Sequence, residues 1–189
     1  MTKPSKTKAV DTASNSVLLS PWIQKSLYLL LILVSATLVY INCLDNDFVM
    51  DDMTLIRGNW KLRSLENIWN ILFHSYRPLR TMSYAIDYHF WGFNPVGYHI
   101  TNIILHALSS LWVYAIIQRL TRNVRVSLYT AILFAVHPIH TDAVTYMSGR
   151  RDVLFAFFYL AAFYFFLCYR ENIKLRYALA SFGSFVLSM

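Results

Sequence analysis

Long apolar runs without charged side chains constrain the fold of this chain more than any other feature. The first run covers residues 26–44, and its 19 residues come close to the ~20 that a helix needs to cross a ~30 Å hydrocarbon core. Only 14% of all residues are charged and 57% are hydrophobic, so a polar surface could not cover this chain in water. The sequence therefore predicts an all-α, polytopic helical membrane protein.

Four further apolar runs predict the rest of the helical bundle. They cover residues 98–118, 126–136, 153–169 and 177–189. We expect the second of these to form a short or broken helix, because His137-Pro138 follows it and proline tends to end helices. The first run is longer than the apolar part of a cleaved signal peptide and predicts a retained anchor. About five transmembrane helices are thus expected, the last of them truncated.

Basic residues are distributed unequally between the segments that join these runs. Residues 1–25, 119–125 and 170–176 hold ten basic and two acidic residues, whereas residues 45–97 and 137–152 hold seven basic and eight acidic residues. Since cytoplasmic loops carry the excess of Lys and Arg, residues 1–25 are expected to form a cytoplasmic basic tail. Topology thereby explains the net charge of +7, so nucleic acid is not an expected partner.

The two cysteines are expected to be unpaired. Cys43 falls at the outer end of the first span and Cys168 at the inner end of the fourth, about a bilayer thickness apart. Neither cysteine lies in a metal-ligand spacing, so both are interpreted as small apolar side chains.

The outer loop of residues 45–97 is too long for a connector and predicts structure of its own. We expect Ser64 to cap one amphipathic helix and Pro78 to begin a second. The apolar face of the first helix is expected to hold Leu65, Ile68, Trp69 and Leu72. That of the second is expected to hold Leu79, Met82, Ile86 and Phe90. Both helices are predicted to lie along the outer membrane surface.

Asp51 and Asp52 belong to a group of four carboxylates within residues 45–52. Near an apolar interface, desolvation and mutual repulsion raise the pKa of such groups, and a carboxylate placed there can act as a base or hold a cation. The alternative is a solvated loop that caps the next helix, and spacing alone favours that alternative.

A second polar group lies between the short third helix and the fourth span. It comprises His137, His140, Asp142, Arg150, Arg151 and Asp152. Two histidines and a carboxylate can bind a metal, whereas two guanidinium groups offer forked donors for a phosphate. The alternative interpretation is interfacial snorkelling for the arginines and helix capping for the acids.

Two smaller groups complete the candidates. Arg77 and Arg80 flank the start of the second amphipathic helix, where they can meet lipid headgroups or a phosphorylated ligand. His99, Asn102 and His106 recur at helical spacing in the second span, so we expect them to share an inward-facing side of that helix.

Five motifs along the chain, in order, carry a family resemblance. They are Phe48–Asp52 (FVMDD), Tyr76–Leu79 (YRPL), Gly97–Ala107 (GYHITNIILHA), Leu133–Val144 (LFAVHPIHTDAV) and Ser148–Asp152 (SGRRD). With these motifs the chain resembles the transmembrane and tetratricopeptide-repeat O-mannosyltransferases and their prokaryotic relatives, over residues 48 to about 165.

The resemblance implies a GT-C type glycosyltransferase. Such an enzyme moves a sugar, here mannose, from a polyprenyl-phosphate carrier to a protein hydroxyl on the outer or lumenal face by inverting displacement. The catalytic base is then Asp51 or Asp52, with Asp52 available to orient the sugar or the acceptor. The lipid phosphate is assigned to Arg150, Arg151 and Arg77. The substrate pocket is assigned to His137, His140, Asp142, Asp152 and His99.

The same resemblance implies the partners and the location. The partners are membrane lipid, the polyprenyl-phosphate sugar and an acceptor protein, and the location is the plasma membrane of a prokaryote or the endoplasmic reticulum membrane of a eukaryote. No metal or other cofactor is expected, because arginine alone can stabilise a monophosphate leaving group. Residues 26–189 are expected to be the N-terminal part of the membrane domain, without the tetratricopeptide repeats of fuller members.

A non-enzymatic transport or assembly subunit is the competing hypothesis. In that case His99, His106, His137 and Asp142 form an inward-facing path for protons or ions. A transporter places its polar residues near the membrane midplane, whereas a lipid-sugar transferase gathers them at the outer interface. Most acids and arginines of this chain are expected at the outer interface, which favours the transferase.

Overall fold

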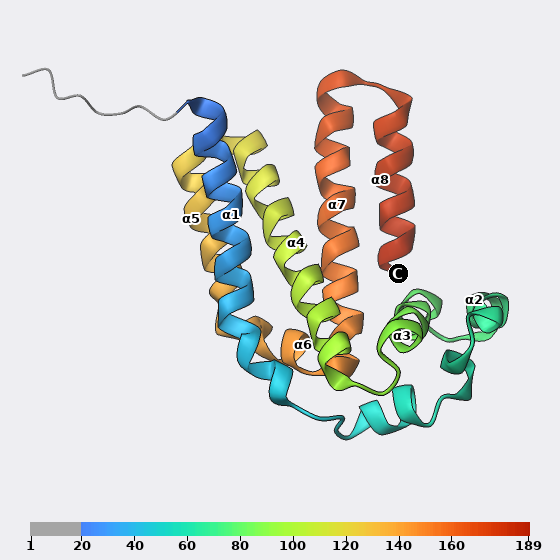
Figure 1. The fold of residues 1–189 in the computed structure, drawn as a ribbon. Helices are drawn as coiled ribbons and strands as arrows, with labels where there is room; N and C mark the ends of the chain where they lie inside the picture. The colour runs from blue at the N-terminus through green and yellow to red at the C-terminus, as the bar shows by residue number, and fades with distance from the viewer. Residues whose placement is uncertain (1–19) are drawn as a thin grey trace, which may run out of the picture.

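The computed structural model describes residues 20–189, which form helices and turns without any strand. Five longer helices form an elongated bundle, and shorter helices gather at one end of it (Figure 1). The longer helices are α1 (Pro21–Tyr40), α4 (Pro95–Thr121), α5 (Val124–Val136), α7 (Arg150–Asn172) and α8 (Leu175–Ser188). The predicted all-α class is confirmed. Residues 1–19, most of the predicted basic tail, lie outside the described residues.

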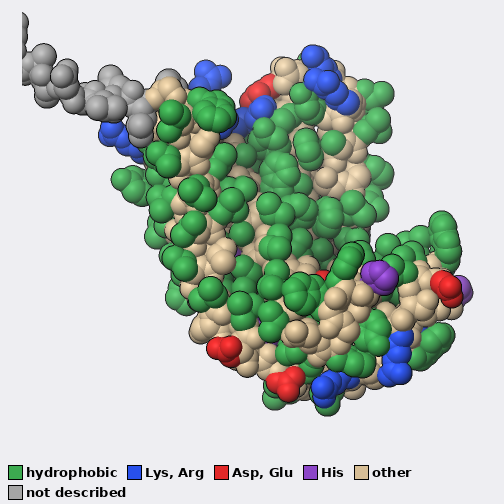
Figure 2. Space-filling view, in the orientation of Figure 1, with side chains coloured by type: hydrophobic (Ala, Val, Ile, Leu, Met, Phe, Trp, Pro, Cys, Tyr) green, Lys and Arg blue, Asp and Glu red, His purple; other side chains and the backbone are tan. Residues whose placement is uncertain are grey.

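Three helical segments are long and apolar enough to cross a membrane. They are Trp22–Asp45, Pro95–Thr121 and Met147–Asn172. The helices α5 and α8 have only 13 and 14 residues. Hydrophobic side chains cover the visible flank of the bundle, and charged side chains gather toward its two ends (Figure 2). The chain is therefore a membrane protein, while the expected number of five spans stays a prediction.

Capping residues explain where α4 and α5 begin, and a proline explains where α5 ends. Asn94 and Asn123 precede the two helices, and each side chain accepts a hydrogen bond from a backbone N–H of the first turn. Pro138 follows the end of α5 closely, as the interruption in the sequence predicted. The short third helix is thus confirmed.

Small side chains bring the helices of the bundle together. Ala36 of α1, Ala107 of α4 and Ala135 of α5 form one buried cluster, because alanine allows helix backbones to approach closely. On the other flank of α4 lies α7, followed by α8 (Figure 1). Ser181 of α8 donates a hydrogen bond to the Ala162 carbonyl of α7 at 2.9 Å. The two flanks of α4 therefore carry different parts of the bundle.

The outer segment between α1 and α4 has its own small core. Its elements are a 3-10 turn (Ile41–Asp45), a π-helical turn (Met53–Arg57), two further 3-10 turns (Trp60–Arg63 and Leu65–Asn67), α2 (Ile68–His74) and α3 (Pro78–Trp91). The core comprises Phe48, Ile56, Leu62, Ile71, Tyr84, Ala85, Tyr98 and Met147. The expectation that this loop is structured is confirmed.

The first amphipathic helix begins later than predicted. Ser64 caps only a 3-10 turn, by accepting from the Glu66 N–H, and α2 itself begins at Ile68. Because a 3-10 turn has fewer residues per turn than an α-helix, the face rotates and Ile71 is buried. Trp69, expected on the apolar face, and the neighbouring Phe73 are exposed, and that arrangement suits contact with lipid.

The second amphipathic helix begins at Pro78, as predicted. Its inward side is mixed, since Tyr84 and Asp87 are buried there. Met82 of the predicted apolar face also packs against the core of the outer segment. Ile86 and Phe90 of the predicted apolar face are exposed, and that arrangement suits contact with lipid. The position of α2 and α3 along the membrane surface stays a prediction.

Candidate functional site at the outer end

The carboxylates of Asp51 and Asp52 lie in different surroundings although the two residues are adjacent. Asp52 is 1% exposed, whereas Asp51 is exposed. The residue before them, Met50, has a φ of 44°, a left-handed conformation that is uncommon for residues other than glycine. The two carboxylates therefore differ in their access to a ligand.

Asp52 joins the first outer loop to the turn before α7. Its Oδ1 accepts a hydrogen bond from the Ser148 N–H at 2.8 Å, and its Oδ2 accepts one from the Val49 N–H at 3.1 Å. Burial raises the pKa of Asp52, and these two bonds oppose the rise. With both oxygens engaged by backbone donors, Asp52 is suited to position the loop.

The carboxylate of Asp51 forms no hydrogen bond or ion pair with any of residues 20–189. The backbone N–H of Asp51 donates to the Tyr146 hydroxyl at 3.1 Å, a contact that spans 95 positions of the chain. Tyr146 and Ser148 both belong to the turn before α7, so one turn holds the backbone of Asp51 and the side chain of Asp52. The pair is anchored while the Asp51 side chain remains accessible.

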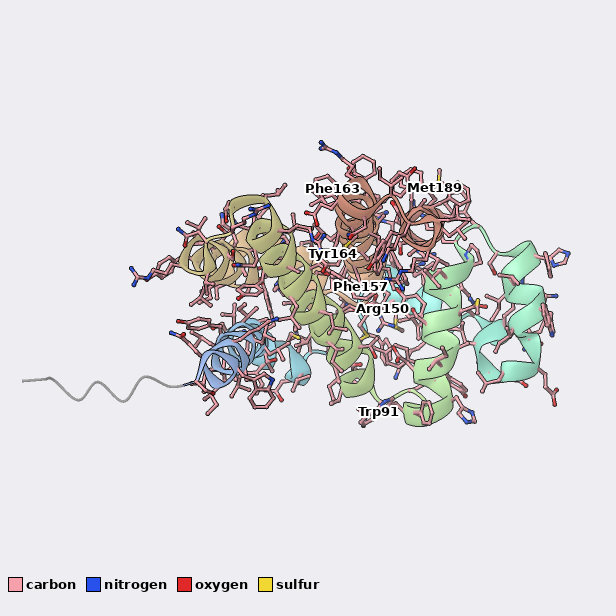
Figure 3. All side chains as sticks on the ribbon, turned by 90° about the horizontal axis from the view of Figure 1, so that it is seen from above. Trp91, Arg150, Phe157, Phe163, Tyr164 and Met189 are labelled. Carbon is pink, nitrogen blue, oxygen red and sulfur yellow. The ribbon has the colours of Figure 1, made fainter. Side chains whose placement is uncertain are left out.

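Arg150 is fully buried, where α3, α4 and α7 meet (Figure 3). Its guanidinium lies 2.7 Å from Asp87 Oδ2, an ion pair whose alignment is not that of a hydrogen bond. Its N–H groups donate to the Asn102 side chain, the Ser83 hydroxyl and the Tyr98 carbonyl. This geometry does not support the predicted lipid-phosphate role for Arg150, because its donors are used inside the protein.

The surroundings of Arg150 also hold the turn that carries Tyr146 and Ser148. The Asn102 amide donates to the carbonyls of Val144 and Tyr146, at 3.2 and 3.0 Å. The Tyr84 hydroxyl donates to the Met147 carbonyl at 2.9 Å. Burial raises the pKa of Tyr84 to about 12, so this hydroxyl stays protonated at neutral pH. A buried polar network therefore positions Asp51 and Asp52 from inside the protein.

Arg77, Arg80 and Arg151 form a second group of cations, which we call the arginine cluster; Arg151 is exposed, and Arg77 and Arg80 are partly buried. Burial lowers the pKa of Arg80; the charges of Arg77 and Arg151 lower it further, whereas Tyr84 and Asp51 raise it. Arg77 and Arg80 lie at the start of α3 and Arg151 lies at the start of α7, two helices that contact each other. Of the predicted phosphate site, Arg77 and Arg151 thus belong to the cluster and are not fully buried, unlike Arg150.

Two members of the cluster are not held by strong protein partners. The Nε atom of Arg80 is buried without a hydrogen-bond partner among residues 20–189. Arg151 pairs with Asp152 at 2.7 Å, and both side chains are about half exposed. Surface pairs of this kind contribute little to stability, so Arg151 can exchange its partner. The sequence analysis named Arg80, together with Arg77, as a candidate for lipid headgroups or a phosphorylated ligand, but the lipid-phosphate assignment included only Arg77 of the two.

A pocket of about 610 Å³ lies beside Asp52. It is lined by Asp45, Asn46, Asp47, Val49, Met50, Asp52, His99, Asp142, Thr145 and Tyr146. His99 is 1% exposed; its Nε2 lies 3.2 Å from the Asn46 carbonyl oxygen. Its Nδ1 is buried without a partner in the described part of the chain. The structure therefore brings together two predicted pocket residues, His99 and Asp142.

The other predicted pocket residues lie elsewhere. His137 caps the turn Pro138–His140, since its Nδ1 accepts from the Ile139 N–H at 3.1 Å. The ring of His140 lies 4.4 Å from that of Phe134, and burial lowers the pKa of His140. Asp152 faces Arg151 at the start of α7. These side chains do not line the pocket beside Asp52, which we call the acidic pocket.

The sequence also predicted that the cysteines are unpaired and that no metal is needed. Cys43 and Cys168 are both buried and free, as predicted. Within residues 20–189, no three His, Cys, Asp or Glu side chains are grouped as a metal site. The expectation that no metal is needed stays a prediction.

Gly149 is required by the close packing of the turn before α7. A Cβ atom at this position would lie 2.6 Å from the Ala143 carbonyl oxygen, closer than real Cβ contacts. We expect Gly149→Ala to lower the free energy of unfolding by ~1–3 kcal/mol, because the backbone has to move. Thermal unfolding in detergent measures the change. Gly183→Ala is the control, since a Cβ atom there would meet no heavy atom of residues 20–189 within 4 Å, and equal losses in both variants would contradict the packing argument.

Comparison with known proteins identifies relatives of this chain. Residues 63–189 match the family model described as dolichyl-phosphate-mannose-protein mannosyltransferase. Mouse protein O-mannosyl-transferase TMTC4 is 37% identical over 147 residues, which cover 63% of this chain and 20% of that protein. Xenopus laevis protein O-mannosyl-transferase tmtc2 is 35% identical over 160 residues, which cover 76% of this chain and 19% of that protein. The chain spans about a fifth of the length of these relatives, and no solved structure matches it.

Proposed function

The chain belongs to the dolichyl-phosphate-mannose-protein mannosyltransferase family, and we propose that its outer end transfers mannose from a polyprenyl-phosphate carrier to a protein hydroxyl. The observation that carries this proposal is the accessible carboxylate of Asp51, whose backbone is hydrogen-bonded to Tyr146 in the turn that leads to Arg151. Such a site combines a base with cations that suit a phosphate leaving group.

Asp51 is the general base in this proposal. The acceptor hydroxyl oxygen forms a bond to the anomeric carbon of mannose while its proton passes to the Asp51 carboxylate. The bond between that carbon and the phosphate oxygen breaks, and the lipid phosphate leaves with the electron pair. Because the acceptor attacks the face opposite to the phosphate, the configuration at the anomeric carbon is inverted.

The arginine cluster binds the lipid phosphate and stabilises its charge as it leaves. Guanidinium groups present planar, forked donors that match phosphate oxygens. Arg77 and Arg151 keep the role predicted for them, and Arg80 takes the place of the buried Arg150. When the phosphate binds, Arg151 leaves its ion pair with the exposed Asp152 and pairs with the phosphate.

The acidic pocket holds the sugar. Its carboxylates accept hydrogen bonds from sugar hydroxyls, and the unpartnered Nδ1 of His99 supplies a further polar contact. Asp52 positions this pocket through Ser148 and Val49 and does not exchange protons. In this proposal the site faces the outer or lumenal side, the N-terminus is cytoplasmic, and no metal takes part.

Arg80→Gln is expected to weaken binding of the carrier by roughly 10–100-fold, because a charged hydrogen bond to phosphate contributes ~1.5–3 kcal/mol. The measurement is equilibrium binding of a short-chain polyprenyl-phosphate mannose to the protein in nanodiscs. Arg63→Gln, an exposed arginine of the same outer segment, is the matched control and should bind as the unaltered chain does. Equal weakening in both variants would mean that only net charge matters and would contradict the proposed phosphate site.

The transport hypothesis finds no specific support among the described residues. The Nε2 atoms of His99 and His106 each contact a backbone carbonyl oxygen, of Asn46 and Ala135 respectively. These contacts join α4 to the outer loop and to α5. Absence of carrier binding in the experiment above would contradict the transferase and favour the transport hypothesis, with ion flux through these histidines.

A further inference from the structure

A second ligand-sized groove lies at the end of the bundle opposite to Asp51. It has a volume of about 700 Å³ and is formed by side chains of α1, α4 and α7. Residues near its mouth include Lys25, where α1 begins, and Arg119 and Arg122, where α4 ends. The outer site occupies the other ends of these helices (Figure 1), so the groove is separate from it.

The inner part of the groove is aromatic. The ring of Trp112 lies 5.2 Å from that of Tyr164 and 6.4 Å from that of Phe157. Phe157 and Tyr164 lie between α7 and α4 when the bundle is viewed along its length (Figure 3). Leu29 of α1 completes the apolar lining. A wall of this kind suits a hydrocarbon chain.

The mouth of the groove carries positive charge that the described protein does not neutralise. Arg119 is engaged, because it pairs with Glu171 and stacks on Tyr164 at 5.0 Å. Lys25 and Arg122, by contrast, form no ion pair among residues 20–189. Arg122 also has a φ of 54°, so it ends α4 in a left-handed conformation. Two cations therefore remain for an external anion.

We propose that this groove binds a phospholipid with an anionic headgroup. The headgroup phosphate lies between Lys25 and Arg122, and one acyl chain lies along Trp112 toward Phe157. The distribution of polar and apolar residues matches an amphiphile, and the unneutralised cations match a net negative headgroup. A helix of another protein would cover the aromatic wall without supplying that anion. The inference does not depend on the proposed transferase activity.

Quenching of Trp112 fluorescence by brominated acyl chains tests this proposal. The chain has five tryptophans, and Trp22, Trp60, Trp69 and Trp91 are replaced by phenylalanine so that only Trp112 reports. Nanodiscs then contain brominated phosphatidylglycerol or brominated phosphatidylcholine as a minor component. We expect half-maximal quenching at a roughly tenfold lower fraction of the phosphatidylglycerol, because two cations favour its headgroup.

Two pairs of substitutions separate a specific site from general attraction. Lys25→Gln with Arg122→Gln should abolish the preference for phosphatidylglycerol. Arg125→Gln with Arg170→Gln removes two basic residues outside the groove lining and should retain it. Equal quenching by both lipids, or equal loss of preference in both pairs, would overturn the proposal. So would protection of Trp112 from both lipids, which would mean that protein covers the groove.

Native mass spectrometry of the chain with its natural tryptophans provides a second readout. It avoids the four tryptophan substitutions, one of which changes the packing of Trp91 against Gly97. Retained phosphatidylglycerol adducts are expected for the unaltered chain and for the Arg125/Arg170 pair, but not for the Lys25/Arg122 pair. Equal retention of phosphatidylcholine by the unaltered chain would contradict the proposal.

Discussion

Asp51→Asn is expected to lower the rate of mannosyl transfer by roughly 10²–10⁴-fold, the contribution typical of a general base. The carboxamide has nearly the shape of the carboxylate but cannot take the proton of the acceptor hydroxyl. Binding of the carrier should remain, because the arginine cluster is unchanged. The measurement is the rate of mannosyl transfer from polyprenyl-phosphate mannose to an acceptor peptide. The protein is expressed from its native gene and reconstituted in nanodiscs.

Matched carboxylates distinguish catalysis from a loss of fold or charge. Glu66→Gln changes an exposed carboxylate of the same outer segment and should leave transfer unaltered. Asp52→Asn should lower both the rate of transfer and the free energy of unfolding. The reason is that an amide cannot accept hydrogen bonds from both the Ser148 and Val49 N–H groups. Unaltered transfer in Asp51→Asn, or an equal loss in Glu66→Gln, would exclude Asp51 as the base.

Arg150→Met is expected to lower the free energy of unfolding by ~3–5 kcal/mol, the cost of leaving a buried partner charge unpaired. The substitution removes the cation beside Asp87 and the donors that reach Asn102. Since Asn102 also holds the turn at Val144 and Tyr146, the outer site should lose its arrangement together with the fold. Unfolding in mixed detergent micelles measures the loss.

The neighbouring arginine supplies the control for this prediction. Arg151→Met removes an exposed pair with Asp152 and should change the free energy of unfolding by less than ~1 kcal/mol. The double variant Arg150→Met/Asp87→Leu should lose less stability than the two single losses added together, because no buried charge remains unpaired. If Arg150→Met kept full stability and lost only carrier binding, the phosphate role expected from the sequence would be restored.

The helices of the bundle were predictable because charge-free runs and helix breakers are local signals. The run at residues 98–118 lies within α4, and that at residues 153–169 lies within α7. The end of α5 followed from Pro138. In each case the signal and the structure that it specifies occupy the same stretch of chain.

The outer segment was harder because its helices depend on distant partners. Nothing local to Ser64 indicates that a 3-10 turn replaces the first turn of a helix and rotates Ile71 inward. That outcome depends on a core that includes Tyr98 and Met147, far along the chain. Register in such a short helix follows from tertiary packing rather than from propensity.

The roles of adjacent residues were likewise not separable from the sequence. Arg150 and Arg151 have the same side chain, yet the first faces inward to Asp87 and the second faces the surface. Asp51 and Asp52 divide in the same way, because Ser148 reaches only one of them. Motifs identified the segments that meet at the outer end, and three-dimensional packing determines which member of each pair is accessible.

Photo-crosslinking of the carrier tests the central claim most directly. The probe is a polyprenyl-phosphate mannose with a photoreactive group next to its phosphate, and mass spectrometry maps its adducts. We predict adducts in residues 76–84, which include Arg77 and Arg80, and in residues 146–152, with loss of both in Arg80→Gln. Adducts confined to the opposite end, around Trp112 and Arg122, would contradict the account, as would adducts that Arg80→Gln leaves unaltered.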